Sequence, residues 1–174
     1  YVGGSPAVGI TVWQVASQAG VFEWMSWGEE KISEGVEWIE TFEEMKQVYL
    51  LRQQVFQGRT LESDESIHRY VKDASGPTAR VRQFLAMDAQ TDEPLSQAGM
   101  SLYPELKVAF MFAGGTLESA RGRGAYTALV AARVAHARSI GIDHIGLFAR
   151  KDSSSPIVDR QGFEYCGEMQ EWSL

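Results

Sequence analysis

The residues with the clearest chemical potential are Arg121-Gly122-Arg123-Gly124, which stand between an apolar run and a segment with helical periodicity. A helix that starts directly after such a turn leaves its first backbone N–H groups without intrahelical partners, and the helix dipole adds positive charge there. Glycines let an anion approach this backbone closely, and Arg121 and Arg123 can add charge at its rim. The pattern predicts a phosphate-binding turn. A tight turn with two solvated arginines is the alternative interpretation of the same residues.

The turn is expected to connect a buried strand to a long helix. Residues 108–113 read VAFMFA, an apolar run typical of a strand that is buried on both faces. Gly114 and Gly115 follow and are expected to end this strand. After the turn, apolar residues recur at helical spacing up to Gly141, a residue type that favours the position just past a helix end. These apolar residues are Tyr126, Leu129, Val130, Val134, Ala137 and Ile140.

The sequence before the turn predicts a strand, two helices and a meander of strands. Thr41 and Glu44 have the spacing of a capping box, so a helix is expected to start there and to end at Gly58. A second helix is expected near residues 65–71. Strands are predicted at 36–39, 81–87, 96–102 and 142–149 and after Gly162, with a short helix from 153 to 161.

This order of elements, together with Arg121-x-x-Gly124 and the later pair Gly162-Phe163, resembles the GNAT superfamily of acetyltransferases. Phe163 lies 42 residues after Arg121, a spacing typical of that family. The resemblance covers about residues 81–174. It implies an α/β (α+β) fold in which helices flank a mixed, largely antiparallel central sheet, and it predicts a single GNAT-like domain over residues 1–174.

The resemblance also implies a cofactor site and an activity. In the family the turn holds the pyrophosphate of acetyl-CoA, the acyl donor, and a backbone N–H of the preceding strand meets the thioester carbonyl. The implied activity is transfer of the acetyl group to a primary amine of a small molecule or a protein. Tyr126 stands where the family has a small residue. The candidate cofactor-binding residues are Gly114, Gly115, Thr116, Arg121, Gly122, Arg123, Gly124, Ala125 and Tyr126.

The proton-transfer groups cannot be assigned from the sequence, so the catalytic residues are left open. The family often has a tyrosine four residues before the Gly-Phe pair, where it protonates the leaving thiolate, and Val158 stands at that position. Val158 is expected to be a core residue of the short helix. Tyr165, a serine among residues 153–155, or water are the alternatives for the proton donor. A catalytically silent acyl-CoA-binding or regulatory domain on the same fold is the alternative function.

Composition limits the partners. A length of 174 residues with 44% apolar content suits one domain. Acidic residues outnumber basic ones 23 to 16, which argues against a nucleic-acid partner. The single cysteine and three scattered histidines have no metal-ligand spacing, so no metal site is expected. Cys166 is expected to be a small buried hydrophobe in a reducing, cytoplasmic setting, and no apolar run approaches the roughly 18 residues of a membrane span.

Residues 1–35 have the least clear sequence pattern of the chain. Residues 10–15 and 21–27 are rich in β-forming residues and predict a hairpin. The segment is interpreted as an N-terminal extension or as the remnant of an upstream acetyltransferase-like half. Its tryptophans predict core and sheet-edge packing, with an aromatic wall for the acceptor or a homodimer surface as the alternatives. The chain begins with Tyr1 rather than Met, which leaves upstream sequence open.

The acidic residues of the segment 62–65 have two interpretations. In the family this connection borders the acceptor site, so Glu62, Asp64 and Glu65 could attract an ammonium group. Acidic residues near a helix start also favour the helix dipole without any further function, and this second interpretation is the simpler one. His68 is expected to be a surface residue of that helix rather than a base.

Overall fold

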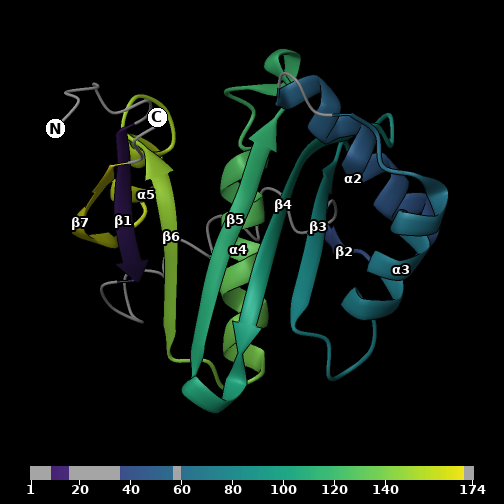
Figure 1. Cartoon of the computed structure of the whole chain (residues 1–174). Coiled ribbons are helices and arrows are strands. Elements are labelled where there is room, and N and C mark those ends of the chain that lie inside the picture. Colours follow the sequence, from purple (N-terminus) through teal and green to yellow (C-terminus); the bar gives the residue numbers. More distant parts are fainter. Residues whose placement is uncertain (1–8, 16–35, 57–59, 171–174) are drawn as a thin grey trace, which may run out of the picture.

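The computed structural model describes residues 9–15, 36–56 and 60–170 of the chain (Figure 1). The strands are β1 (Gly9–Val15), β2 (Val36–Trp38), β3 (Val81–Met87), β4 (Pro94–Tyr103), β5 (Val108–Thr116), β6 (His144–Arg150) and β7 (Phe163–Gln170). The helices are α2 (Phe42–Val55), α3 (Asp64–Ala74), α4 (Ala125–Ser139) and α5 (Ser155–Asp159), with 3-10 turns at Pro104–Leu106 and Glu118–Ala120.

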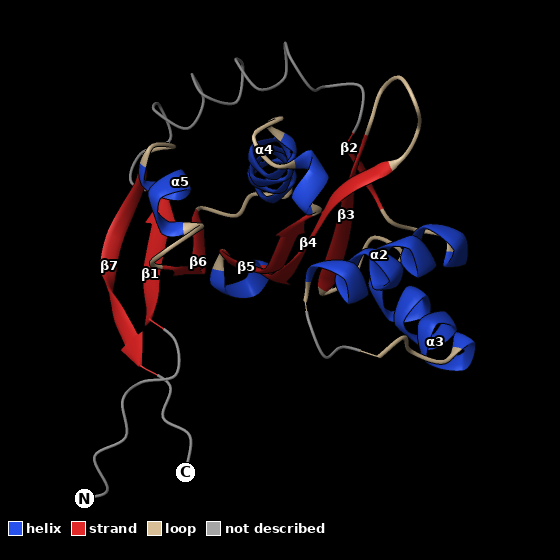
Figure 2. Ribbon diagram, turned by 90° about the horizontal axis from the view of Figure 1, so that it is seen from above, coloured by secondary structure: helices blue, strands red, loops and turns tan. Residues whose placement is uncertain are grey.

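These strands form one sheet in the order β2-β3-β4-β5-β6-β1-β7. The pair β5 and β6 is parallel, and the other neighbouring pairs are antiparallel. Figure 2 shows α4 and α5 against one face of the sheet and α2 and α3 against the other. The predicted fold class, a mixed and largely antiparallel sheet flanked by helices, is confirmed.

Each face of the sheet has its own hydrophobic core. Under α4, the side chains of Leu129, Val130 and Val134 are fully buried in a cluster that includes Met100 and Met111 of the sheet. Under α2 and α3 a smaller cluster contains Ile39, Met45, Val48, Leu51, Ile67 and Leu85. Among the described residues, no helix combines the length and the apolar character that crossing a bilayer requires.

The helix ends follow the capping signals of the sequence. The backbone N–H of Glu44 donates to Thr41 Oγ1 at 3.3 Å, and the backbone N–H of Thr41 donates to Glu44 Oε2 at 3.0 Å, which confirms the capping box of α2. α2 ends at Val55, before the predicted Gly58. Gly141 has a φ of +75° just after α4, a conformation that glycine adopts without steric cost, so its predicted position past the helix end is confirmed.

Two predictions for the central strand β5 were wrong. Gly114 and Gly115 do not end it, because the strand continues through both to Thr116. The strand is also not buried on both faces: Ala109 and Met111 are buried, whereas Phe110 and Phe112 on the other face are half-buried. The reason is that α2 and α3 cover the β2–β4 side of that face, and the Phe110 ring packs mainly on Phe148 of β6, with 4.7 Å between ring centroids.

The predicted hairpin of residues 10–15 with 21–27 was also wrong. β1 lies between β6 and β7 and pairs antiparallel with both, so both of its edges are occupied. A strand has two hydrogen-bonding edges, and none is left for a third partner. Residues 21–27, and most of the proposed N-terminal extension, lie outside the described residues.

Cys166 is exposed, contrary to the prediction that it is buried. It belongs to β7, the edge strand of the sheet, where Glu164 and Tyr165 are exposed as well. Phe163, at the start of the strand, is the β7 residue that enters the core.

Val158 of α5 is fully buried in the core under α4, as predicted. Replacing it with aspartate places an unpaired carboxylate among apolar side chains, and we expect Val158→Asp to lower the free energy of unfolding by at least about 3 kcal/mol. Urea denaturation followed by circular dichroism measures this change. Ile157→Asp, at the half-exposed neighbouring position, is the matched control and should cost much less. Equal stability losses in the two variants would contradict the burial of Val158.

Candidate functional site

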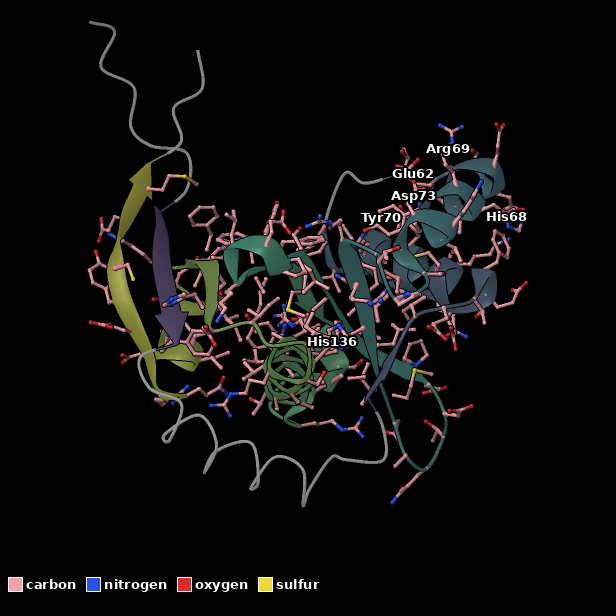
Figure 3. The ribbon with its side chains drawn as sticks, turned by 90° about the horizontal axis from the view of Figure 1, so that it is seen from below. Glu62, His68, Arg69, Tyr70, Asp73 and His136 are labelled. Atoms are coloured by element: carbon pink, nitrogen blue, oxygen red, sulfur yellow. The ribbon has the colours of Figure 1, made fainter. Side chains whose placement is uncertain are left out.

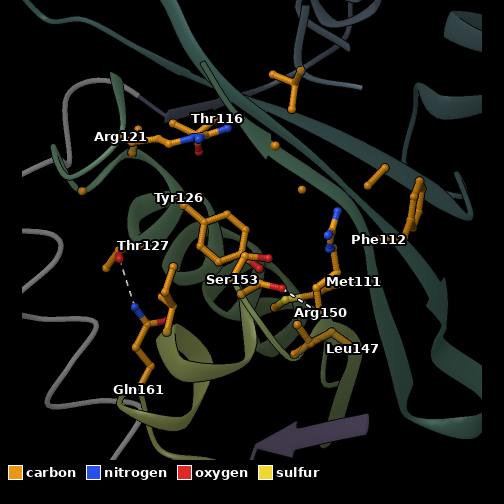
Figure 4. Close-up of a pocket in the computed structure, with 18 of the residues that line it drawn as sticks. Met111, Phe112, Thr116, Arg121, Tyr126, Thr127, Leu147, Arg150, Ser153 and Gln161 are labelled. Carbon is orange, nitrogen blue, oxygen red and sulfur yellow. Dashed lines mark hydrogen bonds between the residues drawn. The ribbon is translucent and has the colours of Figure 1, made fainter. Parts of the chain in front are cut away.

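A cleft opens where β5 and β6 part. The two strands pair in parallel from Val108 and His144 to Met111 and Leu147, and the ladder stops there although both strands continue. The space between them, together with the start of α4 and the segment before α5, forms a cleft of about 1060 Å³. In Figure 4, Arg121 and Thr116 lie toward one end of this cleft and Met111 and Leu147 toward the other, with the ring of Tyr126 between them.

A bulge in β5 accompanies this parting. Ala113 has a φ of +49°, and the register with β4 shifts between Gln97 and Gly99. The side-chain amide of Gln97, a fully buried residue, donates to the carbonyl oxygen of Ala113 at 2.6 Å. Arg52 of α2 donates in turn to Gln97 Oε1 at 3.0 Å. A bulge bends its strand, so these contacts fix where β5 turns away from β6.

The two glycines after the bulge are required by close neighbours on opposite sides of the strand. A Cβ atom at Gly114 would lie 2.8 Å from Cε2 of Tyr126 in α4. A Cβ atom at Gly115 would lie 2.6 Å from Cγ1 of Val55 at the end of α2. Both distances are shorter than packed carbon atoms tolerate, so a side chain at Gly114 would have to displace the Tyr126 ring, and one at Gly115 the Val55 side chain.

The start of α4 has the geometry of an anion site. Gly122 and Gly124 have φ values of +74° and +89°, and Gly124 is the N-cap of the helix without a side-chain cap. A Cβ atom at Gly122 would have no heavy atom within 4 Å, so the glycine is needed for its backbone conformation rather than for space. No side chain caps the N–H groups of the first turn, and this turn lines the cleft with Ala125, Tyr126 and Thr127.

Arginines dominate the charge of the cleft. The described residues that line the cleft include four arginines and one carboxylate, that of Asp152. The arginines are Arg121, Arg133, Arg150 and Arg160. That carboxylate accepts hydrogen bonds from Arg150 Nε and Nη2 at 3.3 and 3.1 Å, which lower the pKa of Asp152. The cleft is therefore positive within a chain whose net charge is −7, and it favours an anionic ligand.

The structure brings eight of the nine candidate residues to the cleft. Those that line it are Gly114, Gly115, Thr116, Arg121, Gly122, Gly124, Ala125 and Tyr126. Arg123 does not, because its guanidinium pairs with Asp88 in the loop between β3 and β4. This contact also lowers the pKa of Asp88. Cofactor binding by these residues stays a prediction.

Some of the candidate proton donors line the cleft and others do not. Ser153 and Ser154 line the cleft, and Ser154 Oγ accepts a hydrogen bond from the backbone N–H of Arg150 at 2.9 Å. Tyr165 is half-exposed on β7 and is not a lining residue, and Val158 points into the core. A hydroxyl at the tyrosine position of the family is thus replaced by an apolar side chain that does not face the cleft.

The three histidines lie away from the cleft. His68 is an exposed residue of α3, as predicted, and stacks on Phe42 with 4.1 Å between ring centroids. His136 lies on α4, distant from the α3 group in Figure 3, and burial together with the nearby Arg82 lowers its pKa. None of the three, His144 included, is among the described lining residues.

The acidic segment lies at the start of α3. Asp64 and Glu65 occupy the first turn, where they pair with Lys46 at 3.2 Å and with Arg69 at 3.4 Å. Figure 3 shows Glu62 on the same side of the molecule as His68 and Arg69. None of the three carboxylates lines the cleft. Their positions agree with the helix-dipole interpretation.

Several lining residues were missed by the sequence reasoning. Arg150 and Arg160 had no motif, and Gln161, whose amide donates to Thr127 Oγ1 at 3.0 Å, stood beside the noted glycine. Phe56, directly after the end of α2, also lines the cleft. Arg133 could have been noticed in the sequence, because it is a charged residue within the apolar stretch ALVAARVAHA. Charged side chains are rarely buried without a partner, so an arginine at such a position suggests a special role.

Among known proteins, the similarity of this chain is to solved structures of the same fold. No model of a protein family matches the sequence, and no curated protein matches it. A solved GCN5-related N-acetyltransferase from Sphaerobacter thermophilus is similar, with a TM-score of 0.66 and 14% identity, covering 95% of this chain and 51% of that one. A Trypanosoma brucei acetyltransferase has a TM-score of 0.64 and 16% identity, covering 80% of this chain and 99% of that one. The chain therefore spans about half of the Sphaerobacter protein and nearly all of the Trypanosoma one.

A third similar structure is a Staphylococcus epidermidis protein described as functionally unknown, with a TM-score of 0.59 and 13% identity, covering 92% of this chain and 59% of that one. At these identities the likeness concerns the fold. The chain has the fold of the GNAT acetyltransferases, which confirms the resemblance seen in the sequence.

The hydrogen bond from Gln97 to the bulge gives a testable prediction. Gln97→Met keeps the length of the side chain but leaves the carbonyl oxygen of Ala113 and the Nε of Arg52 without this partner. We expect the free energy of unfolding to fall by about 1 kcal/mol, the net contribution of a hydrogen bond whose partners are only partly buried, because Ala113 is exposed and its carbonyl oxygen can be hydrated. Urea denaturation measures it. A change below about 0.5 kcal/mol would mean that the bulge does not depend on Gln97.

Proposed function

We propose that the chain is an N-acetyltransferase that uses acetyl-CoA as acyl donor and a primary amine of a small molecule or a protein as acceptor. The observation that carries this proposal is the uncapped start of α4, which opens into a cleft lined by four arginines. The phosphates of the donor are proposed to bind over residues 122–126, with the pantetheine arm between the parted strands. Both the helix start and the arginines favour a polyanion.

The donor fits this site in shape as well as in charge. The cleft volume of about 1060 Å³ suits an extended ligand. The space above Gly122 is free of neighbouring atoms, so a phosphate oxygen can reach the backbone N–H groups. Acetyl-CoA supplies the activated acyl group, and the chain's own residues bind and orient it.

A catalytically silent acyl-CoA-binding domain is the second candidate. Two observations favour it. Val158, a buried residue without a hydroxyl, stands at the usual tyrosine position of the family, and no histidine is among the described residues that line the cleft. If the chain is an acetyltransferase, its protons would instead move through water or through Ser153. The two candidates share the binding site and differ in turnover, so turnover decides between them. The acceptor and the homodimer stay predictions.

Binding at the turn can be tested with a pair of glycine variants. Gly122→Ala and Gly76→Ala both place a Cβ atom where φ is positive and no heavy atom lies within 4 Å. Each should lose about 1 kcal/mol of stability through backbone strain alone. We expect the calorimetric Kd for acetyl-CoA to rise at least tenfold in Gly122→Ala and to stay unchanged in Gly76→Ala. Equal affinity in the two variants would remove the turn from the site.

Turnover is measured with acetyl-CoA and a panel of primary amines, with mass spectrometry of the acetylated products. Because Cys166 is a free and exposed thiol that would add to the signal of a thiol reagent, Cys166→Ser is used wherever released CoA is followed by its thiol. We expect amine-dependent release of CoA with an equal amount of acetylated amine. Saturable binding without product from any amine would support the silent domain instead.

A further inference from the structure

Arg133 is an arginine buried in the middle of α4. Its exposed fraction is 1%, and it is among the largest fully buried side chains of the described residues. Leu129, Val130 and Val134 around it on the helix belong to the hydrophobic core. Charged side chains are almost never buried in this way without a partner, so its position needs an explanation beyond packing.

The guanidinium is incompletely satisfied by the protein. Nε donates to the carbonyl oxygen of Leu129 at 2.9 Å, and Nη1 donates to that of Gly99 at 3.2 Å. Nη2 has no hydrogen-bond partner, and no carboxylate forms a salt bridge with Arg133, as far as the chain is described. Burial lowers the pKa of Arg133, whereas the charge of the adjacent Tyr126 and a side-chain hydrogen bond with it act in the opposite direction. Arginine nevertheless stays protonated at neutral pH, so a positive charge remains that no carboxylate among the described residues neutralises.

This charge lies at the deep end of the cleft. Arg133 is a lining residue, eight positions after the start of α4 at Ala125, which is about 12 Å further along the helix axis. Its partner Gly99 pairs with Phe112, next to Met111, where the β5–β6 ladder stops. The phosphate site and Arg133 are therefore at opposite ends of the space between the strands.

We propose that Nη2 of Arg133 donates a hydrogen bond to the carbonyl oxygen of the thioester and stabilises the negative charge that forms on it. This inference rests on the proposed function, because the acyl end of a donor whose phosphates bind at residues 122–126 reaches the deep end of the cleft. Arg133 would then be a catalytic residue, supplied by a side chain of α4 in addition to the backbone of β5.

The step conserves atoms and electrons. The lone pair of the neutral amine forms the new bond to the carbonyl carbon, and the π pair of the C=O bond moves onto the oxygen that Arg133 holds. When that pair returns, the C–S bond breaks and its electrons leave with the CoA sulfur. The nitrogen gives its proton to water, and the thiolate takes a proton from water, so the products are the amide and CoA-SH.

The energetics favour this assignment. A guanidinium fixed in a dry site needs no reorganisation as charge develops on the oxygen, and its attraction is stronger there than in water. Its interaction with a neutral carbonyl is weaker than with an oxyanion, so it stabilises the transition state more than the bound substrate.

The test is the infrared band of the thioester carbonyl in bound acetyl-CoA, identified by its shift on 13C labelling of the carbonyl carbon. A hydrogen bond from a cation polarises the C=O bond and lowers its stretching frequency. The wild type is compared with Arg133→Met, which removes the charge at similar length, and with Arg138→Met, which removes another arginine of α4 that does not line the cleft. Affinity for acetyl-CoA and thermal stability are measured on all three.

We expect a lowered band in the wild type and in Arg138→Met, and a band near its solution frequency in Arg133→Met, with Kd changed less than threefold. With an accepted amine, kcat should fall about 100-fold or more in Arg133→Met. The melting temperature of Arg133→Met should not fall, because removal of an unpaired buried charge offsets the two lost hydrogen bonds.

A wild-type band at its solution frequency overturns the inference while leaving acetyl-CoA binding in place, and this result does not depend on any variant folding. An equally lowered band in Arg133→Met overturns it too. Succinyl-CoA that binds more than tenfold tighter than acetyl-CoA, with the preference lost in Arg133→Met, would show that the guanidinium holds a carboxylate of the acyl group instead. If the wild type binds no acetyl-CoA at all, the proposed function fails and this inference with it.

Discussion

The hydrogen bond between the Gln97 amide and the Ala113 carbonyl governs the geometry of the site. It holds β5 in a conformation with a positive φ at an alanine, which an ordinary strand does not adopt. Beyond this point β5 no longer follows β6, and the cleft lies in the resulting space. Local strain of this kind persists where surrounding contacts over-determine it, and here they come from a buried network.

That network links the helices α2 and α3 to the bulge of β5. Arg52 of α2 donates to the side-chain oxygens of both Gln97 and Gln83, and Gln83 donates in turn to the hydroxyl of Tyr70 in α3. α2 and α4 also close on the strand from opposite faces at Gly115 and Gly114. Contacts from the helices on both faces of the sheet thus surround the point where β5 and β6 part.

The sequence predicted the features that local patterns determine. The capping box at Thr41, the glycine end of α4 and the buried face of that helix all follow from residues close together in the chain. The failures have a shared cause, since they depend on what lies beside a strand in space. The pairing of β1 with β6 and β7, the half-exposed face of β5 and the exposure of Cys166 on an edge strand are set by distant segments.

The same distinction applies to the candidate site: the residues with a local sequence pattern were predicted, and those placed by distant segments were not. The glycine turn could be predicted because a positive φ favours glycine and a helix start follows directly in the sequence. Arg150 and Arg160 reach the cleft through the positions of β6 and α5, which no local pattern encodes. Arg133 was readable in principle as a charge in an apolar helix face, but its direction toward the cleft depends on α4 packing under the bulge.

The most direct measurement is amide hydrogen exchange followed by mass spectrometry, with and without saturating acetyl-CoA. The account predicts slower exchange in peptides that cover β5 from Phe112 to Thr116 and the start of α4 from Gly122 to Thr127, with α3 unchanged. Exchange that is unaffected in these two segments, or slowed only elsewhere in the chain, would contradict the claim that the parted strands and the uncapped helix start form the acyl-donor site.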